Sequence, residues 1–194
     1  MQNKDEYKGR LLEPENAGIP GFNVPNTKIA KFGKVAKDVY YDRLEECGFN
    51  LKEDDIVPWE ELKYPERATK GSAGYDFFSP VSFDLRPKAT IFVPTGIRCD
   101  MYPGWVLMLY PRSSAAIYSM VSLANTTFVI DSDYCMAEDG GNICLVFHNT
   151  SEGRLWQIKK GDRIGQGVFS LFGLTVDDLC NQPVRSGGRG STGK

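Results

Sequence analysis

The hydrophobic pattern of the chain changes near residue 70. Before it, apolar residues recur at intervals of three and four between Val35 and Cys47, which predicts one amphipathic helix at about 35–47. After it, short apolar runs are broken by proline or glycine every eight to fifteen residues, a pattern typical of many short strands. The runs are Val81–Leu85, Ile91–Val93, Trp105–Tyr110, Ile143–Phe147, Leu155–Ile158 and Gly167–Leu171. This part of the chain is therefore expected to be all-β, as a sandwich, jelly roll or barrel.

Polar segments flank the predicted strands. Residues 1 to about 30 have the composition of a loop or arm, and the stretch from Glu53 to Glu61 is acidic and is interpreted as a solvated linker. The end of the chain is basic and rich in glycine and serine, so it should be disordered by itself. We therefore expect an extension at 1–61 with one short helix, a β domain at 62–184, and a flexible arm at 185–194.

Composition excludes several classes of function. Of 194 residues, 41% are hydrophobic, and the formal net charge is −2. A protein that wraps nucleic acid would be basic, so phosphate chemistry is expected on a small molecule instead. The single histidine, His148, is expected to be structural, which argues against Ser-His-Asp or Cys-His chemistry.

The cysteines and the hydropathy bear on the compartment. The chain has five cysteines and no CxxC pair, so we expect reduced thiols. No apolar run approaches the ~20 residues that cross a bilayer, and the charged start does not resemble a signal peptide. We expect a cytoplasmic protein that binds neither membrane nor nucleic acid.

Four short clusters carry groups that suit phosphate chemistry. Pro111–Ser114 ends a predicted strand with a cation, two hydroxyls and backbone N–H groups. Ile130–Tyr134 places two carboxylates beside a tyrosine, and carboxylates can act as a general base or hold Mg²⁺. Gly161–Gln166 is a turn that ends on an amide, and Arg185–Gly193 combines glycines, arginines and hydroxyls that can surround a phosphate. Taken singly, each cluster also fits an ordinary surface turn.

Together with Ser72–Phe77, these clusters resemble the five ordered motifs of the trimeric dUTPase family, over about residues 62–194. In this comparison the third motif begins at Leu123 and runs to Tyr134. The resemblance implies a distorted jelly-roll subunit of the β-clip type, arranged as a homotrimer whose active sites are shared between chains. It also implies the activity of a dUTP diphosphatase, which hydrolyses dUTP to dUMP and pyrophosphate.

The resemblance further implies a role for individual residues. Asp131 would be the general base for the water that attacks the α-phosphorus, Arg112 would orient the catalytic set, and Asp76 would support the site. Asn125 would bind uracil, and Tyr134 would lie under the deoxyribose and exclude a 2′-hydroxyl. The substrate-binding residues implied in full are Ser113, Ser114, Asn125, Tyr134, Gln166, Arg185, Arg189, Ser191 and Thr192. Mg²⁺ is expected as cofactor, held mainly by the substrate phosphates rather than by side chains.

The chain departs from the family pattern at several positions. Cys135–Gly140 is an insertion of about five residues in what the resemblance implies is a hairpin tip, a change that loops absorb at modest cost. Phe128 stands where glycine is common, and Arg189 stands where an aromatic residue usually stacks on uracil. The first 60 or so residues lie outside the match and could bind a protein partner that nothing in them identifies.

Two other interpretations stay open. A dCTP deaminase-like enzyme shares the fold family, but it needs a glutamate near the base, and residues 125–134 contain none. A regulatory or binding protein could keep the fold and use the extension and the inserted segment to hold a partner. The joint presence of Asp131, Tyr134, Arg112 and Gln166 favours an enzyme.

Replacement of Arg189 tests the departure in the C-terminal arm. A guanidinium can stack on a flat base as an aromatic ring does. Arg189→Phe should therefore leave kcat/KM for dUTP within about tenfold of the parent, a change of at most ~1.4 kcal/mol. A much larger loss in steady-state kinetics would assign Arg189 a specific phosphate contact.

Overall fold

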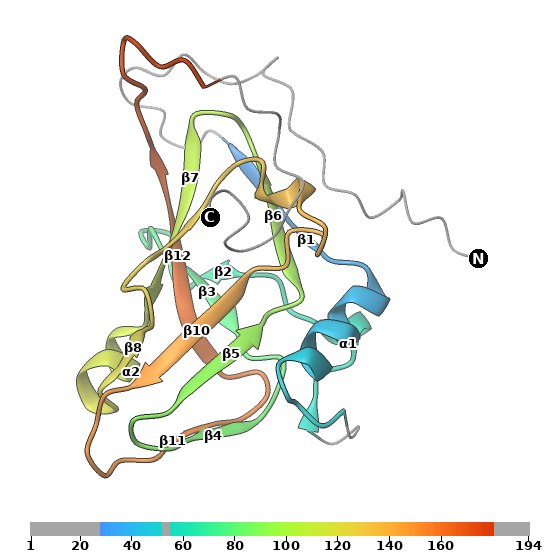
Figure 1. The fold of residues 1–194 in the computed structure, drawn as a ribbon, viewed down its shortest axis with the longest axis vertical. Helices are drawn as coiled ribbons and strands as arrows, with labels where there is room; N and C mark the ends of the chain where they lie inside the picture. Colours follow the sequence, from blue (N-terminus) through green and yellow to red (C-terminus); the bar gives the residue numbers. More distant parts are fainter. Residues whose placement is uncertain (1–27, 52–54, 181–194) are drawn as a thin grey trace.

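A five-stranded antiparallel sheet runs through the length of the molecule (Figure 1). The structure is a computed structural model, and it describes residues 28–51 and 55–180. The strands of this sheet, in spatial order, are β2 (Glu66–Arg67), β3 (Tyr75–Phe78), β12 (Arg163–Leu171), β7 (Trp105–Pro111) and β9 (Phe128–Ile130). β12 is the organising strand, because it pairs with β3 on one side and with β7 over seven positions on the other.

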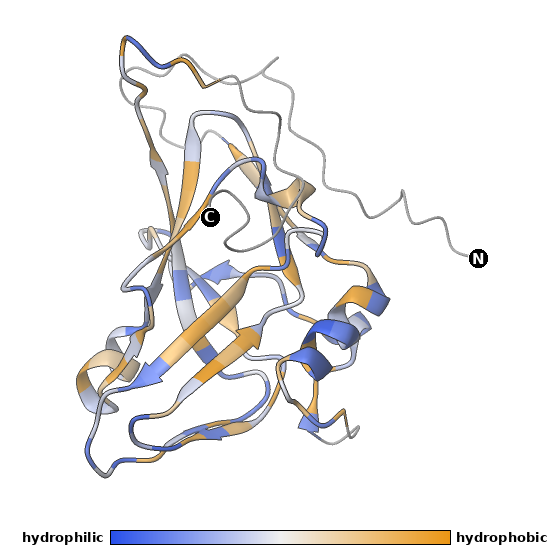
Figure 2. Cartoon of the chain, viewed as in Figure 1, coloured by the Kyte–Doolittle hydropathy of each residue, from blue (hydrophilic) through white to orange (hydrophobic). Residues whose placement is uncertain are grey.

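A second sheet has three antiparallel strands, β5 (Thr90–Pro94), β10 (Cys144–Asn149) and β8 (Val121–Leu123). β10 lies in the centre, and all of its residues except His148 are buried. A continuous apolar run suits such a position, since a central strand is covered by its neighbours and by the core. Figure 2 shows this hydrophobic character along β10 and β5.

Two strand pairs complete the β structure. β4 (Phe83–Leu85) pairs with β11 (Trp156–Ile158), and β1 (Ala30–Lys34) pairs with β6 (Ile97–Met101), both antiparallel. The described part of the chain is mostly β, so the expected all-β class is confirmed. Six strands were not predicted, and each of them has five residues or fewer: β1, β2, β3, β6, β8 and β9.

The expected helix is confirmed as α1 (Lys37–Glu46), slightly shorter than predicted. A second helix, α2 (Ser113–Tyr118), was not predicted, because only Ala115 of its six residues is buried and no apolar periodicity results. Two single-turn 3₁₀ helices, η4 (Trp59–Glu61) and η5 (Tyr134–Met136), lie in connections. No helix among the described residues is long and apolar enough to cross a membrane.

Residues of the N-terminal segment share the core of the β domain. Val35, Tyr40 and Leu44 are fully buried and belong to the same hydrophobic cluster as Phe77, Leu107 and Phe147. The Tyr40 hydroxyl donates a hydrogen bond of 2.8 Å to the Val57 carbonyl, which satisfies the polar end of a buried ring. Helix α1 is therefore packed as part of the core, on the right of the view in Figure 1.

The cysteines and the histidine have structural positions. All five cysteines are free thiols, as expected, and burial raises the pKa of Cys135 to about 11. His148 lies on β10, and its Nδ1 is 2.9 Å from the Thr90 hydroxyl on β5. A cross-strand contact of this kind agrees with the structural role that we expected for this histidine.

Two glycine substitutions test how tightly α1 is packed. Gly96 and Gly104 both have positive φ, 72° and 84°, so alanine strains the backbone at either position. A Cβ at Gly96 would lie 2.7 Å from the Tyr40 ring and 2.8 Å from Leu62 Cδ1, whereas at Gly104 it would meet nothing within 4 Å. We expect Gly104→Ala to lower the free energy of unfolding by about 1 kcal/mol. Gly96→Ala should cost about 1–3 kcal/mol more, because it also overpacks a core. If urea denaturation showed that both variants lose the same free energy of unfolding, this packing of α1 would be contradicted.

Candidate active site

A buried carboxylate joins side chains of three motifs. Asp76 on β3 is 8% exposed. Its Oδ1 lies 3.2 Å from Nε of Arg112, which precedes α2, and its Oδ2 lies 3.2 Å from Nη1 of Arg163 on β12. Two cations on one carboxylate leave an excess positive charge, which suits an anionic ligand. Arg163 was missed as a site residue, although it stands inside the fourth motif, because only the register of β12 and β3 brings it to Asp76.

Gln166 lies beside this cluster because β12 runs between β3 and β7. Its register partners are Asp76 on one side and Tyr110 on the other. Its amide Nε2 donates to the Pro111 carbonyl at 3.4 Å. A Cβ at Gly74 would lie 2.7 Å from Gln166 Oε1, so a side chain at this position would displace the Gln166 amide. The first, second and fourth motifs are far apart in the sequence, and the fold thus brings them together at one place.

The second motif opens helix α2. Arg112 is the N-cap residue, and Ser113 and Ser114 are exposed on the first turn. The first N–H groups of any helix lack partners within it, and they favour an anion. This helix start follows directly on Pro111, whose carbonyl accepts from Gln166, and on Arg112, whose guanidinium lies on the Asp76 carboxylate.

The third motif surrounds β9. Asn125 is exposed in the turn before the strand, and Asp131 is exposed immediately after it. Tyr134 begins η5, and its backbone N–H donates to the Asp131 carbonyl at 3.1 Å. The Tyr134 side chain is only 6% exposed, and its hydroxyl points toward the Asn142 carbonyl at 3.3 Å and Asp139 Oδ2 at 3.5 Å.

The expected hairpin tip at 135–140 is wrong. β9 pairs with β7 in the five-stranded sheet, whereas β10 pairs with β5 and β8 in the other sheet. The segment between them is therefore a crossover from one sheet to the other, and it contains η5. Phe128 on β9 is half-buried and packs against the core, so this departure from the family pattern is accommodated by packing.

The structure does not bring Asp131 to the phosphate-binding groups of its own chain. β9 runs antiparallel to β7, with Ile130 opposite Leu107 and Phe128 opposite Leu109. Asp131 therefore lies near the start of β7, and Arg112 follows its end. The six residue steps from Val106 to Arg112 correspond to about 20 Å of strand. In one chain, Asp131 and Arg112 therefore lie near opposite ends of β7.

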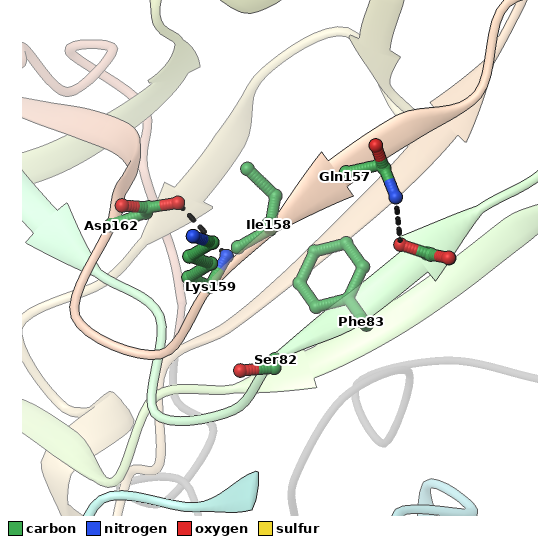
Figure 3. A pocket seen from close by; sticks show the side chains of 7 residues that line it. Ser82, Phe83, Gln157, Ile158, Lys159 and Asp162 are labelled. Atoms are coloured by element: carbon green, nitrogen blue, oxygen red, sulfur yellow. Dashed lines mark hydrogen bonds between the residues drawn. The ribbon is translucent and has the colours of Figure 1, made fainter.

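A surface pocket of ≈ 460 Å³ lies elsewhere, over β4 and β11 (Figure 3). It is lined in part by Asp84, Gln157, Lys159 and Asp162, and by none of the residues expected in the site. Gln157 Nε2 donates to Asp84 Oδ1 at 3.2 Å, and the Lys159 backbone N–H donates to Asp162 Oδ2 at 2.9 Å. This pocket is therefore separate from the residues that the sequence analysis singled out.

Some expectations lie outside the described residues. Arg185, Arg189, Ser191 and Thr192 belong to the C-terminal arm, which the structure does not describe. Within residues 28–51 and 55–180, no group of three or more His, Cys, Asp or Glu side chains could hold a metal ion.

Comparison with known proteins identifies the family. The family model of dUTPase matches residues 60–193. The deoxyuridine 5′-triphosphate nucleotidohydrolase of Lactococcus lactis is 37% identical over 135 residues, which cover 68% of this chain and 89% of that protein. The corresponding protein of Caulobacter vibrioides is 34% identical over 146 residues, covering 70% and 90%.

Solved structures agree with this assignment. The crystal structure of dUTPase from Streptococcus mutans superposes with a TM-score of 0.55 at 34% identity, over 66% of this chain and 98% of that one. A mutant dUTPase from phage phi11 of S. aureus, which coordinates a structural Mg(II) ion, has the same fold, with a TM-score of 0.52 at 22% identity over 68% and 94%. The chain therefore belongs to the dUTPase family.

Proposed function

We propose that this protein hydrolyses dUTP to dUMP and pyrophosphate, with Asp131 as the general base for the attacking water. The observation that carries the activity is the family match over residues 60–193, together with relatives at 34–37% identity that are named deoxyuridine 5′-triphosphate nucleotidohydrolase. The match covers about nine tenths of the length of those relatives.

The proposed reaction is an in-line displacement at the α-phosphorus. The water oxygen forms a bond to the α-phosphorus, its proton passes to the Asp131 carboxylate, and the bond from the α-phosphorus to the bridging oxygen breaks to release pyrophosphate. The Asp131 carboxylate is exposed, so a water molecule can reach it, as a general base requires. Its place directly after β9 fixes its backbone, while the side chain stays accessible to water.

The phosphate half-site is proposed at the cluster around Asp76. The Asp76 carboxylate holds the Arg112 guanidinium in one orientation, which makes Asp76 a supporting group rather than a reacting one. Ser113, Ser114 and Gln166 would then donate to the phosphate oxygens. Arg185, Ser191 and Thr192 of the arm are proposed to bind the γ-phosphate, as the family pattern implies, and Arg189 to contact the base or a phosphate.

The nucleoside half-site is proposed at the third motif. Asn125 and Asp131 lie at opposite ends of β9, so the nucleoside would lie along this strand with uracil near Asn125. The nearly buried Tyr134 ring would form a fixed floor under the deoxyribose. A floor that cannot move rejects a ribose sterically, since a 2′-hydroxyl would have no room.

The wide separation of the two half-sites supports a homotrimer with shared active sites. Groups about 20 Å apart on one chain cannot both contact one triphosphate. A neighbouring copy can supply the missing half, which a closed symmetric assembly repeats at every interface. Mg²⁺ would be held by phosphate oxygens and water, where it neutralises charge on the leaving pyrophosphate.

Loss of Asp131 tests the proposed reaction. Pyrophosphate release is measured with dUTP and Mg²⁺, and in parallel with UTP, dCTP and dTTP. We expect release from dUTP alone, and we expect Asp131→Asn to lower kcat by about a hundred- to ten-thousandfold. Asp84→Asn, at an exposed carboxylate on β4, is the control and should retain the parent rate. Full activity of Asp131→Asn would remove Asp131 from its proposed role.

Mixing two inactive variants tests the shared site. Asp131→Asn and Arg112→Ala each damage one half-site, so each homotrimer should be nearly inactive. Random mixed trimers should regain up to about a quarter of the parent activity, because some sites combine an intact Asp131 with an intact Arg112 from the neighbour. The double variant, refolded by itself, is the control. Mixtures that stay inactive, although light scattering shows exchanged trimers, would place the whole site in one chain.

A further inference from the structure

Two segments that depart from the family pattern meet directly behind Tyr134. One is helix α1, which precedes the region matched by the family model at 60–193. The other is the inserted segment 135–140, which lies in the crossover between the two sheets. Both approach the same side of η5, and Figure 1 shows this crossover above the helix.

The contact between them is an ion pair that also reaches the tyrosine. Arg43 Nη2 on α1 lies 3.7 Å from Asp139 Oδ2, and the Asp139 side chain is only 10% exposed. The same Oδ2 atom lies 3.5 Å from the Tyr134 hydroxyl. The other oxygen, Oδ1, accepts a hydrogen bond of 3.1 Å from the Gly141 backbone N–H. One carboxylate therefore connects the helix, the crossover and the far end of the Tyr134 ring.

Apolar packing and backbone contacts hold the segment in place. A Cβ built at Gly140 would be 3.7 Å from the Val35 side chain, so the crossover lies against the residue that leads into α1. Asn142 Oδ1 accepts a hydrogen bond of 3.0 Å from the Gly96 N–H, and the Gly96 carbonyl accepts one of 3.0 Å from Val35. The position of Asp139 is thus fixed independently of Arg43.

We propose that Arg43 and Asp139 are a positioning pair that fixes the Tyr134 ring, and that α1 thereby sets the selectivity for deoxyribose over ribose. The proposal rests on the proposed role of Tyr134 as the floor of the sugar site. A steric filter discriminates only while its ring stays in place, and a site that is slightly loose loses this precision. An anchor at the hydroxyl limits tilting of the ring, and low exposure keeps the Arg43–Asp139 attraction from being screened.

The other ion pairs of α1 serve as internal comparisons. Arg43 also lies 2.5 Å from Glu46, three residues along the same helix, where Glu46 is 59% exposed. Lys37 pairs with Glu60 at 2.6 Å, and both side chains are more than half exposed. Exposed pairs of this kind contribute little to stability, and neither Glu46 nor Glu60 is bonded to Tyr134.

The experiment measures kcat/KM for dUTP and for UTP in the full-length protein. The variants are Arg43→Ala, Asp139→Ala and the double variant, with Arg43→Lys as conservative rescue, Lys37→Ala as control and Tyr134→Ala as reference. We expect the dUTP-to-UTP selectivity to fall about three- to tenfold in Asp139→Ala and Arg43→Ala, the effect of losing one hydrogen-bonded contact. The selectivity of the double variant should fall no further than that of the more affected single variant, because both residues act through one contact. Arg43→Lys should regain part of the selectivity, and Lys37→Ala should keep all of it.

A second measurement does not depend on turnover. The ring signals of Tyr134 in ¹³C-tyrosine NMR should move or broaden in Asp139→Ala and stay unchanged in Lys37→Ala, while the Tm reports whether each variant is folded. The positioning role of Arg43 and Asp139 would be overturned if Asp139→Ala kept the parent selectivity and unchanged ring signals while Tyr134→Ala lost selectivity. That result would leave the proposed function intact. Parent selectivity in Tyr134→Ala would instead refute the sugar role and the inference built on it.

Discussion

The pairing of β12 with both β3 and β7 is the constraint on which the phosphate half-site depends. These three strands carry the fourth, first and second motifs, which lie far apart in the sequence. Once their register is fixed, Asp76 must face Gln166, and Arg163 and Arg112 come within 3.2 Å of the same carboxylate. The cluster carries one negative and two positive charges, so the fold itself builds a site for an anion.

The antiparallel pairing of β9 with β7 has the opposite effect. It places Asp131 at one end of β7 and the Arg112 cluster beyond the other end. A rigid sheet cannot bring its two ends together, and this separation is the basis for the proposal that a neighbouring copy completes the site. The stiff pairing of these strands thus joins the first, second and fourth motifs within one chain. It also keeps the third motif, which surrounds β9, away from them.

The N-terminal segment is tied to the third motif through the core. Tyr40 and Leu44 of α1 are fully buried, and Tyr40 packs against Gly96. The Gly96 N–H donates to Asn142 Oδ1, and both neighbours of Gly96 form backbone hydrogen bonds with Ile143. The crossover after Tyr134 therefore rests on α1 through apolar contacts as well as through Arg43 and Asp139. The inserted segment is therefore packed against the N-terminal part of the core rather than being an exposed loop.

Sequence by itself determined the features that are local. Apolar runs in β7, β10 and β12 and the spacing in α1 predicted these elements, and the order of five motifs predicted the family. Strand β6, in which Ile97, Cys99 and Met101 alternate with Arg98 and Asp100, was overlooked because it is short, and the exposed helix α2 escaped because it shows no apolar period. Only tertiary structure decided that Arg163 shares Asp76, that the 135–140 segment is a crossover, and that Asp131 lies far from Arg112. Each of these depends on which strands pair and in what register, and that choice is made by long-range packing that no single stretch of sequence contains.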